Sequence, residues 1–262
     1  MKQPREPMFN VPSVVVATIA ALCLVHAGRA LLLSPVDDYR FLLEFAFIPA
    51  RYDASPLLGG PLPGGWGAEI WTFFTYALIH ADIMHLGVNI VWFLPFGAAV
   101  ARRFGPIRFL AFFAVTAAAG ALAHLVSYPG EMVPVIGASA AISGFMAAAL
   151  RFAFQRGGPL TMWRENDPES YRVPAEPLSV ALRDTRVLVF LVAWFGLNFL
   201  FGLGSVAIPG ASGAIAWQAH VGGFLAGLVL FAVFDPIAPA PKGNGNIEPD
   251  SAGSDDAGID AR

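Results

Sequence analysis

Three short motifs, each inside an apolar segment, contain the side chains that could perform chemistry. In chain order they are His80-x4-His85-x3-Asn89, Gly137-x-Ser139 and His220-x2-Gly223-x3-Gly227. A serine hydroxyl becomes a nucleophile when an adjacent base takes its proton, and histidine can do so near neutral pH. Polar and ionisable side chains are costly at hydrocarbon depth and mark functional sites there by default. The motifs therefore predict hydrolytic chemistry performed inside a membrane.

Ser139 and His220 are the candidates for nucleophile and general base. Small residues surround Ser139, and small residues allow another helix backbone to approach closely. Gly223 and Gly227 form a seam of small residues after His220, which we expect to press that helix against the helix of Ser139. No aspartate or glutamate lies between residues 186 and 234, so the predicted unit is a serine–histidine dyad without an acid. The alternative for each residue is an ordinary interhelical hydrogen bond.

His85 and Asn89 are the candidates for stabilising negative charge. They lie four residues apart, hence on one face of a helix. Acyl transfer requires hydrogen-bond donors for the oxyanion of a tetrahedral intermediate, and histidine and asparagine side chains can supply them. We expect both residues to be oxyanion donors, with the backbone N–H of Ser139 as a third.

A metal site is the competing interpretation of His80, Asp82 and His85. Their pattern differs from the His-Glu-x-x-His motif of zinc proteases, because residue 81 is alanine and the histidines are five apart. The chain has a single cysteine, which excludes internal disulfides and the usual cysteine zinc sites. The sequence therefore predicts no metal and no other cofactor. Three further residues in the apolar segments are assigned to packing: Cys23, His26 and His124.

The composition is that of an all-α polytopic membrane protein. Hydrophobic residues make up 56% of the chain and charged residues 13%, and the mean hydropathy is +0.61. Soluble domains contain about 25% charged residues. The net charge of −3 comes from residues 241–262, which contain five acidic and two basic residues. The rest is balanced, which argues against a nucleic-acid partner and leaves the lipid bilayer as the surroundings.

Six apolar segments are long enough to be drawn as membrane-spanning helices. They run over about 11–33, 83–100, 107–127, 135–154, 187–203 and 213–234. A cleaved signal peptide is the alternative for the first, since Lys2 and Arg5 precede it and Ala27-Gly28-Arg29-Ala30 resembles a cleavage site. Its length and the later segments favour an uncleaved helix.

The connecting segments predict an orientation and three regions. Basic residues gather at both ends of the chain and in the second and fourth loops, which the positive-inside rule places in the cytoplasm. The long first loop, 34–82, ends in an aromatic-rich stretch that suits the membrane interface, so we expect a partly embedded lid. The fourth loop, about 155–186, is expected to be irregular and solvated. The regions are a short N-terminus (1–10), a six-helix domain (11–234) and a disordered acidic tail (235–262).

The six segments and the ordered motifs resemble the rhomboid family of intramembrane serine proteases over residues 11–234. The resemblance implies a six-transmembrane-helix bundle with a catalytic dyad of Ser139 and His220, and His85 and Asn89 around the oxyanion. It also implies structural roles near the site for four residues. His80 would brace the first loop, and the others are the glycines of the motifs: Gly137, Gly223 and Gly227. Substrates in this family are other membrane proteins, typically with a single span, cut near the outward end of that span.

Three departures from the family pattern stand out. Ala140 follows the serine where glycine is usual, and Ser143 stands where many members place an aromatic ring that stacks on the histidine. The Trp-Arg pair often found in the first loop is absent, since Trp66 is followed by glycine and Trp71 by threonine. None of these changes removes a catalytic atom.

Two alternatives to a protease remain at the level of sequence. One is a catalytically impaired rhomboid-like factor that binds membrane proteins for quality control, which Ala140 and Ser143 favour. The other is a small transporter or channel, in which buried histidine and asparagine line a pathway. The intact Ser139 and His220 favour a serine endopeptidase. The resemblance implies that it acts on single-span membrane proteins, and the resemblance and the compact loops together predict a bacterial inner membrane. The sequence leaves the oligomeric state open.

Overall fold

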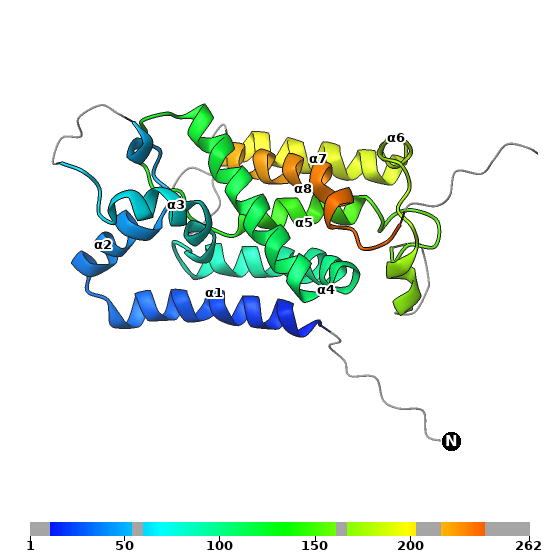
Figure 1. The fold of residues 1–262 in the computed structure, drawn as a ribbon, viewed down its shortest axis with the longest axis horizontal. Helices are drawn as coiled ribbons and strands as arrows, with labels where there is room; N and C mark the ends of the chain where they lie inside the picture. Colours follow the sequence, from blue (N-terminus) through cyan, green and yellow to red (C-terminus); the bar gives the residue numbers. More distant parts are fainter. Residues whose placement is uncertain (1–10, 54–59, 161–166, 203–215, 239–262) are drawn as a thin grey trace, which may run out of the picture.

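The computed structural model describes residues 11–53, 60–160, 167–202 and 216–238, and these residues are folded as helices joined by turns (Figure 1). Within this part of the chain the only extended pairing is a bridge between Phe47 and Val135. The helices are α1 (Ser13–Leu32), α2 (Pro35–Phe45), α3 (Gly65–Thr75), α4 (Ile83–Ser127), α5 (Ser139–Leu150), α6 (Leu178–Ala181), α7 (Thr185–Gly202) and α8 (Trp217–Phe234). Short 3-10 turns lie at Pro49–Tyr52, Tyr76–Leu78 and Pro168–Arg172.

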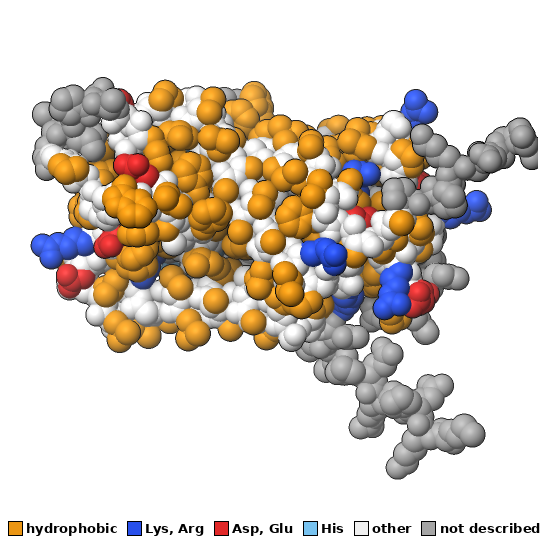
Figure 2. Space-filling model, viewed as in Figure 1, with side chains coloured by type: hydrophobic (Ala, Val, Ile, Leu, Met, Phe, Trp, Pro, Cys, Tyr) orange, Lys and Arg blue, Asp and Glu red, His pale blue; other side chains and the backbone are white. Residues whose placement is uncertain are grey.

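The predicted all-helical membrane architecture is confirmed. Among the described residues, α1, α4 and α8 are long and apolar enough to cross a membrane, and α5 and α7 are shorter apolar helices. Figure 2 shows charged side chains gathered towards the two ends of the long axis, with apolar side chains covering the middle. Large apolar side chains are exposed on α4, α7 and α8, such as Val91 at 66%, Val192 at 74% and Val229 at 70%. Such exposure suits contact with lipid. The count of six spans stays a prediction.

α4 contains the second and third predicted spans as two arms joined at Gly105. That residue has φ 73° and ψ 170°, a left-handed conformation that glycine adopts without a steric penalty. Pro106 then begins the second arm with a φ that suits a first helical residue. The rings of Phe93 and Phe109 lie 5.9 Å apart, so the arms pack together near this end. The loop predicted between the two spans is reduced to a sharp turn.

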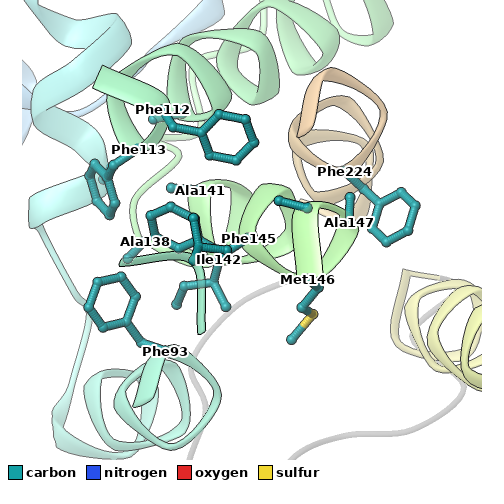
Figure 3. Packing of buried hydrophobic residues seen from close by; sticks show 14 of the residues in the cluster. Phe93, Phe112, Phe113, Ala138, Ala141, Ile142, Phe145, Met146, Ala147 and Phe224 are labelled. Atoms are coloured by element: carbon teal, nitrogen blue, oxygen red, sulfur yellow. The ribbon is translucent and has the colours of Figure 1, made fainter. Parts of the chain in front are cut away.

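α5 is the central helix, and it is shorter than the predicted span of 135–154. Every residue of α5 except Ser139 is buried. Figure 3 shows Phe93, Phe112 and Phe224 packed around it from α4 and α8. The helix begins only at Ser139 because Val135 pairs with Phe47 and because Gly137 has a φ of +119°. The first residues of the predicted span therefore form a turn and not helix. This turn makes Ser139 the first residue of α5.

Close contact between α5 and α8 depends on small residues. A Cβ atom at Gly223 would collide with the carbonyl oxygen of Ala140, and one at Gly227 with that of Gly144. On its other side, Gly144 leaves room for Thr116 of α4, whose Cγ2 would lie 2.5 Å from an added Cβ. The backbones of α5 and α8 therefore approach closely, as small-residue seams permit.

The first loop is a folded unit rather than a linker. Its two helices, α2 and α3, are joined by hydrogen bonds from Trp71 Nε1 to the carbonyl of Glu44 (3.0 Å) and from Thr75 Oγ1 to the carbonyl of Phe45 (2.6 Å). The Phe47–Val135 bridge ties this unit to the turn before α5. The loop thus supports the segment that leads into Ser139.

A buried ion pair closes the opposite end of the bundle and corrects two predictions. The guanidinium of Arg103 donates to both carboxylate oxygens of Asp235, at 2.9 and 2.8 Å, and these side chains are 0% and 6% exposed. Arg103 also donates to the carbonyls of Tyr171 and Val173, each at 2.9 Å. The sequence placed Asp235 in a disordered tail and Val173 in a solvated loop. Both are instead fixed to the bundle, because a buried guanidinium requires a counterion and acceptors. Residues 239–262 lie outside the described part.

Loss of this ion pair should destabilise the protein more than loss of the remaining tail. A chain ending after Ala238 should have the same free energy of unfolding as the full chain. Asp235→Ala should lower the free energy of unfolding by about 3–5 kcal/mol, because Arg103 would stay buried without a counterion. Thermal unfolding in detergent measures both.

Glu169→Ala is the matched control for this experiment. Glu169 pairs with Arg172 at 3.4 Å on the surface, where the side chains are 71% and 74% exposed. Loss of such a pair costs about 1 kcal/mol or less. Equal destabilisation by Asp235→Ala and Glu169→Ala would contradict a role for the buried pair.

Candidate active site

The predicted site residues meet at one end of the bundle, where α4, α5 and α8 begin and α7 ends. Ser139 is the first residue of α5, and His85 and His220 lie in the first turns of α4 and α8. First turns leave backbone N–H groups without helical partners and carry the positive end of the helix dipole. This end therefore combines polar side chains with a field that favours negative charge.

Ser139 and His220 are in hydrogen-bond contact across the α5–α8 interface. Ser139 Oγ lies 2.7 Å from Nε2 of His220, although the residues are 81 positions apart in the chain. Both side chains are partly exposed, while the rest of α5 is buried. A hydroxyl at this distance can give its proton to a neutral imidazole. The arrangement can therefore produce an activated serine at an accessible end of a buried helix.

His85 lies against the turn that precedes Ser139. A Cβ added at Gly137 would lie 2.8 Å from His85 Nε2 and 3.8 Å from Ser139 Oγ, so only glycine leaves room for the imidazole. The other ring nitrogen, Nδ1, accepts the backbone N–H of Ala81 at 3.4 Å. A neutral imidazole that accepts at Nδ1 carries its proton on Nε2. His85 thus presents an N–H donor beside the serine.

Asn89 lies one turn further along α4 and is 4% exposed. Its amide Nδ2 donates to the carbonyl of His85 at 2.9 Å. The structure therefore places Asn89 next to the turn that holds His85, and the contact described for its side chain is with His85 rather than with Ser139.

His80 is fully buried and connects the first loop, α1 and the turn before Ser139. Its Nε2 accepts the backbone N–H of Ala138 at 3.4 Å. Its carbonyl accepts from Arg29 at 2.9 Å and lies 3.3 Å from Nδ1 of His26. His26, which was assigned to packing, thus contributes a polar contact to this bracing network.

His124, also assigned to packing, is buried with its Nε2 atom 3.3 Å from a carboxylate oxygen of Glu131. Its imidazole therefore also lies beside a carboxylate. No cluster of three or more histidine, cysteine, aspartate or glutamate side chains that could hold a metal ion occurs among the described residues.

Asn198 of α7 is a site residue that the sequence analysis missed. Its Oδ1 atom lies 2.7 Å from Nδ1 of His220, and its Nδ2 donates to the carbonyl of Trp194 at 2.8 Å. It is the only asparagine, glutamine, serine, threonine, histidine or charged residue between positions 187 and 202. A lone amide in an apolar span is a functional-site signal that a search for acids alone overlooks.

Ala140 and Ser143, the two departures from the family pattern that follow the serine, both have clear places in the packing. Ala140 is buried, and its methyl group is directed towards α4, where a Cβ added at Gly120 would meet it at 2.5 Å. Ser143 is 4% exposed, and its hydroxyl donates to the carbonyl of Ser139 at 2.8 Å. Neither side chain intervenes between Ser139 and His220.

Comparison with known proteins identifies the family. The model of the Rhomboid domain matches residues 67–236. The chain is 29% identical over 164 residues to a rhomboid protease GlpG of Enterobacter sp. (strain 638), covering 62% of this chain and 48% of that protein. It is 28% identical over 167 residues to the GlpG of Klebsiella pneumoniae subsp. pneumoniae, with the same shares. With the GlpG of Haemophilus influenzae it shares 29% identity over 90 residues, 34% of this chain and 43% of that protein.

The chain spans about half the length of the curated relatives it matches. The matched domain covers more than half of the chain and includes the segments that contain His80, His85, Ser139 and His220. The resemblance seen in the motifs is thereby confirmed, and the chain belongs to the rhomboid family.

Proposed function

We propose that this protein is an intramembrane serine endopeptidase that cleaves membrane proteins through a Ser139–His220 dyad. The observation that carries the proposal is the 2.7 Å contact between Ser139 Oγ and His220 Nε2 at the partly exposed end of a buried helix. Proteases among the relatives support the same class of activity. A catalytically impaired binding factor would not require this contact to be preserved.

The geometry supports a two-step acyl transfer. Ser139 Oγ attacks the carbonyl carbon of the scissile peptide bond while His220 Nε2 takes the hydroxyl proton. The tetrahedral intermediate expels the amine, which receives that proton from His220, and an acyl-enzyme remains. Water then attacks the ester, with His220 again accepting and returning the proton. This restores the free serine and releases the carboxylic acid.

The oxyanion would lie between His85 and the first turn of α5. His85 presents Nε2–H beside Gly137, and the backbone N–H groups that begin α5 have no helical partners. Donors placed in advance, where charge develops, stabilise the intermediate without reorganisation. The dipole of α5 acts in the same sense.

Asn89→Ala should lower kcat more than it raises KM. We expect a decrease of about 10²-fold, the lower end for loss of one oxyanion donor, because His85 and the backbone share the charge. Initial rates over a range of substrate concentrations in detergent separate the two constants. Gln218→Ala is a suitable control, since that side chain contacts Tyr128 at the surface. An unchanged kcat would assign Asn89 to packing.

An apolar groove supports a membrane-protein substrate. It has a volume of about 430 Å³ on the outer face of the first arm of α4. Its lining is formed by Ile83, Met84, Gly87, Val88, Val91 and Trp92. An apolar helix can lie in such a groove without loss of hydration. We infer that a single-span substrate enters sideways from lipid and unwinds near Ser139, close to the outward end of its span.

The proposed setting is a bacterial inner membrane, with six spans and both termini in the cytoplasm. The distribution of basic residues supports this orientation through the positive-inside rule. In this orientation Ser139 would lie towards the outer side of the membrane.

A direct test uses the purified full chain in detergent with a panel of single-span model substrates. Mass spectrometry of the fragments gives the cleavage sites, which should lie near one end of each span. A fluorophosphonate probe reports serine reactivity independently of the substrate. Absence of both cleavage and labelling would overturn the proposal and favour the binding factor.

A further inference from the structure

The structure contains a third polar residue in contact with the proposed dyad. Asn198 is 9% exposed, and its Oδ1 atom lies as close to His220 Nδ1 as Ser139 Oγ does to Nε2, at 2.7 Å in each case. Building on the proposed function, we propose that Asn198 is a positioning residue that fixes the tautomer and the orientation of His220. The working unit would then be Ser139–His220–Asn198.

The hydrogen bonds of the amide determine which atom faces the histidine. Asn198 Nδ2 donates to the carbonyl of Trp194, four residues earlier on α7, so Oδ1 is the atom that faces His220. An amide oxygen only accepts hydrogen bonds, and Nδ1 must therefore carry the imidazole proton. Nε2 is then left with the lone pair that accepts the proton of Ser139. This is the tautomer that a general base needs.

Aromatic packing sets the position of the amide. α7 and α8 run in opposite directions, and the rings of Trp194 and Phe224 lie 4.5 Å apart. Asn198 follows Trp194 by four residues, and His220 precedes Phe224 by four residues. The polar pair therefore lies one helical turn from the ring pair on the same interface. The ring contact holds α7 in the rotation that directs Asn198 at the imidazole.

The other groups described near His220 do not accept a hydrogen bond from its Nδ1 atom. The hydroxyl of Ser143 is engaged with the carbonyl of Ser139. No carboxylate occurs between positions 187 and 234, and the other titratable group that acts on His220 among the described residues is His85. A neutral amide also avoids the cost of a buried carboxylate at membrane depth.

Two substitutions at one position test the proposal. Asn198→Leu keeps the approximate size and removes the acceptor, whereas Asn198→Asp keeps an acceptor and adds charge. Leu197→Ala is the control on the same helix, since Leu197 is 48% exposed. The readouts are the rate of fluorophosphonate labelling, kcat and KM for a model substrate, and the dependence of kcat on pH. Thermal unfolding in detergent verifies that each variant is folded.

Asn198→Leu should lower the labelling rate and kcat by about 10–100-fold with little change in KM, a loss comparable to that seen when the partner that orients a metal-bound histidine is removed. Asn198→Asp should recover most of that loss. A carboxylate favours the protonated imidazole, so the acid limb of the pH profile should move to higher pH in this variant. Leu197→Ala should resemble the wild-type protein. A purely structural role predicts neither the recovery nor the shifted limb.

Nitrogen-15 NMR of labelled histidine gives a reading that does not depend on catalysis. The wild-type spectrum should show the proton of His220 on Nδ1, and Asn198→Leu should give a mixture of tautomers. Wild-type labelling by a folded Asn198→Leu variant, or an unchanged tautomer, would overturn the proposal while the proposed function stood. A wild-type chain that neither cleaves nor labels would overturn the proposed function, and the NMR spectra would still decide whether Asn198 fixes the tautomer.

Discussion

Ser139→Ala should abolish cleavage and fluorophosphonate labelling while leaving the fold intact. Loss of the nucleophile in a serine protease lowers kcat by about 10⁶-fold, which places the variant below detection in a detergent assay. The change in free energy of unfolding should be about 1 kcal/mol, because a partly exposed hydroxyl and one hydrogen bond are removed. Fragment analysis and thermal unfolding measure the two effects.

Ser127→Ala is the control for this substitution. Ser127 ends α4, and its hydroxyl donates to the carbonyl of Ala123 at an exposed position. That variant should cleave at the wild-type rate. Cleavage by Ser139→Ala at the wild-type rate would refute the serine mechanism altogether, whichever substrate is used.

His220→Ala should be as inactive as Ser139→Ala, although the serine remains. Without Nε2 at 2.7 Å, no described side chain is placed to take the proton of Ser139. The loss in kcat should again be about 10⁶-fold, and labelling should fall with it. His124→Ala, which removes a buried imidazole elsewhere in α4, controls for loss of a histidine as such.

The double variant tests whether the two residues act as one unit. Members of such a unit are strongly non-additive, so Ser139→Ala with His220→Ala should be no worse than either single variant. The residual rate then reflects binding and the oxyanion donors alone. Losses that multiply would show that Ser139 and His220 act independently, and the contact between them would be structural.

The turn before α5 explains how non-helical backbone is accommodated inside a bundle of apolar helices. Non-helical backbone is tolerated there when its polar groups find partners inside the protein. Gly137 donates its N–H to the carbonyl of Tyr76 at 3.0 Å, and Ala138 donates to His80 Nε2. The buried hydroxyl of Tyr76 in turn donates to the carbonyl of Ala117 at 2.8 Å. The first loop therefore provides hydrogen-bond partners for the backbone of the turn that positions Ser139.

The sequence by itself determined the membrane class, the helical segments and the identities of Ser139, His220 and His85 as chemical candidates. A long apolar segment in lipid must be helical, because its backbone polar groups have to be satisfied within the segment. Polar residues are rare in such segments, so even a single one indicates a candidate site. The glycines after His220 also indicated which two helices approach closely. These features are local, so one stretch of chain contains the whole signal.

Only the tertiary structure decided which polar groups meet. α7 is apolar on all sides, so hydropathy does not set its rotation, and the contact of Asn198 with His220 depends on the packing of Trp194 against Phe224. Arg103 and Asp235 are 132 positions apart, and their charges predicted exposure rather than a buried pair. The start of α5 at Ser139 follows from the pairing of the preceding turn with the first loop. Each outcome depends on contacts between distant segments, which local composition and periodicity do not encode.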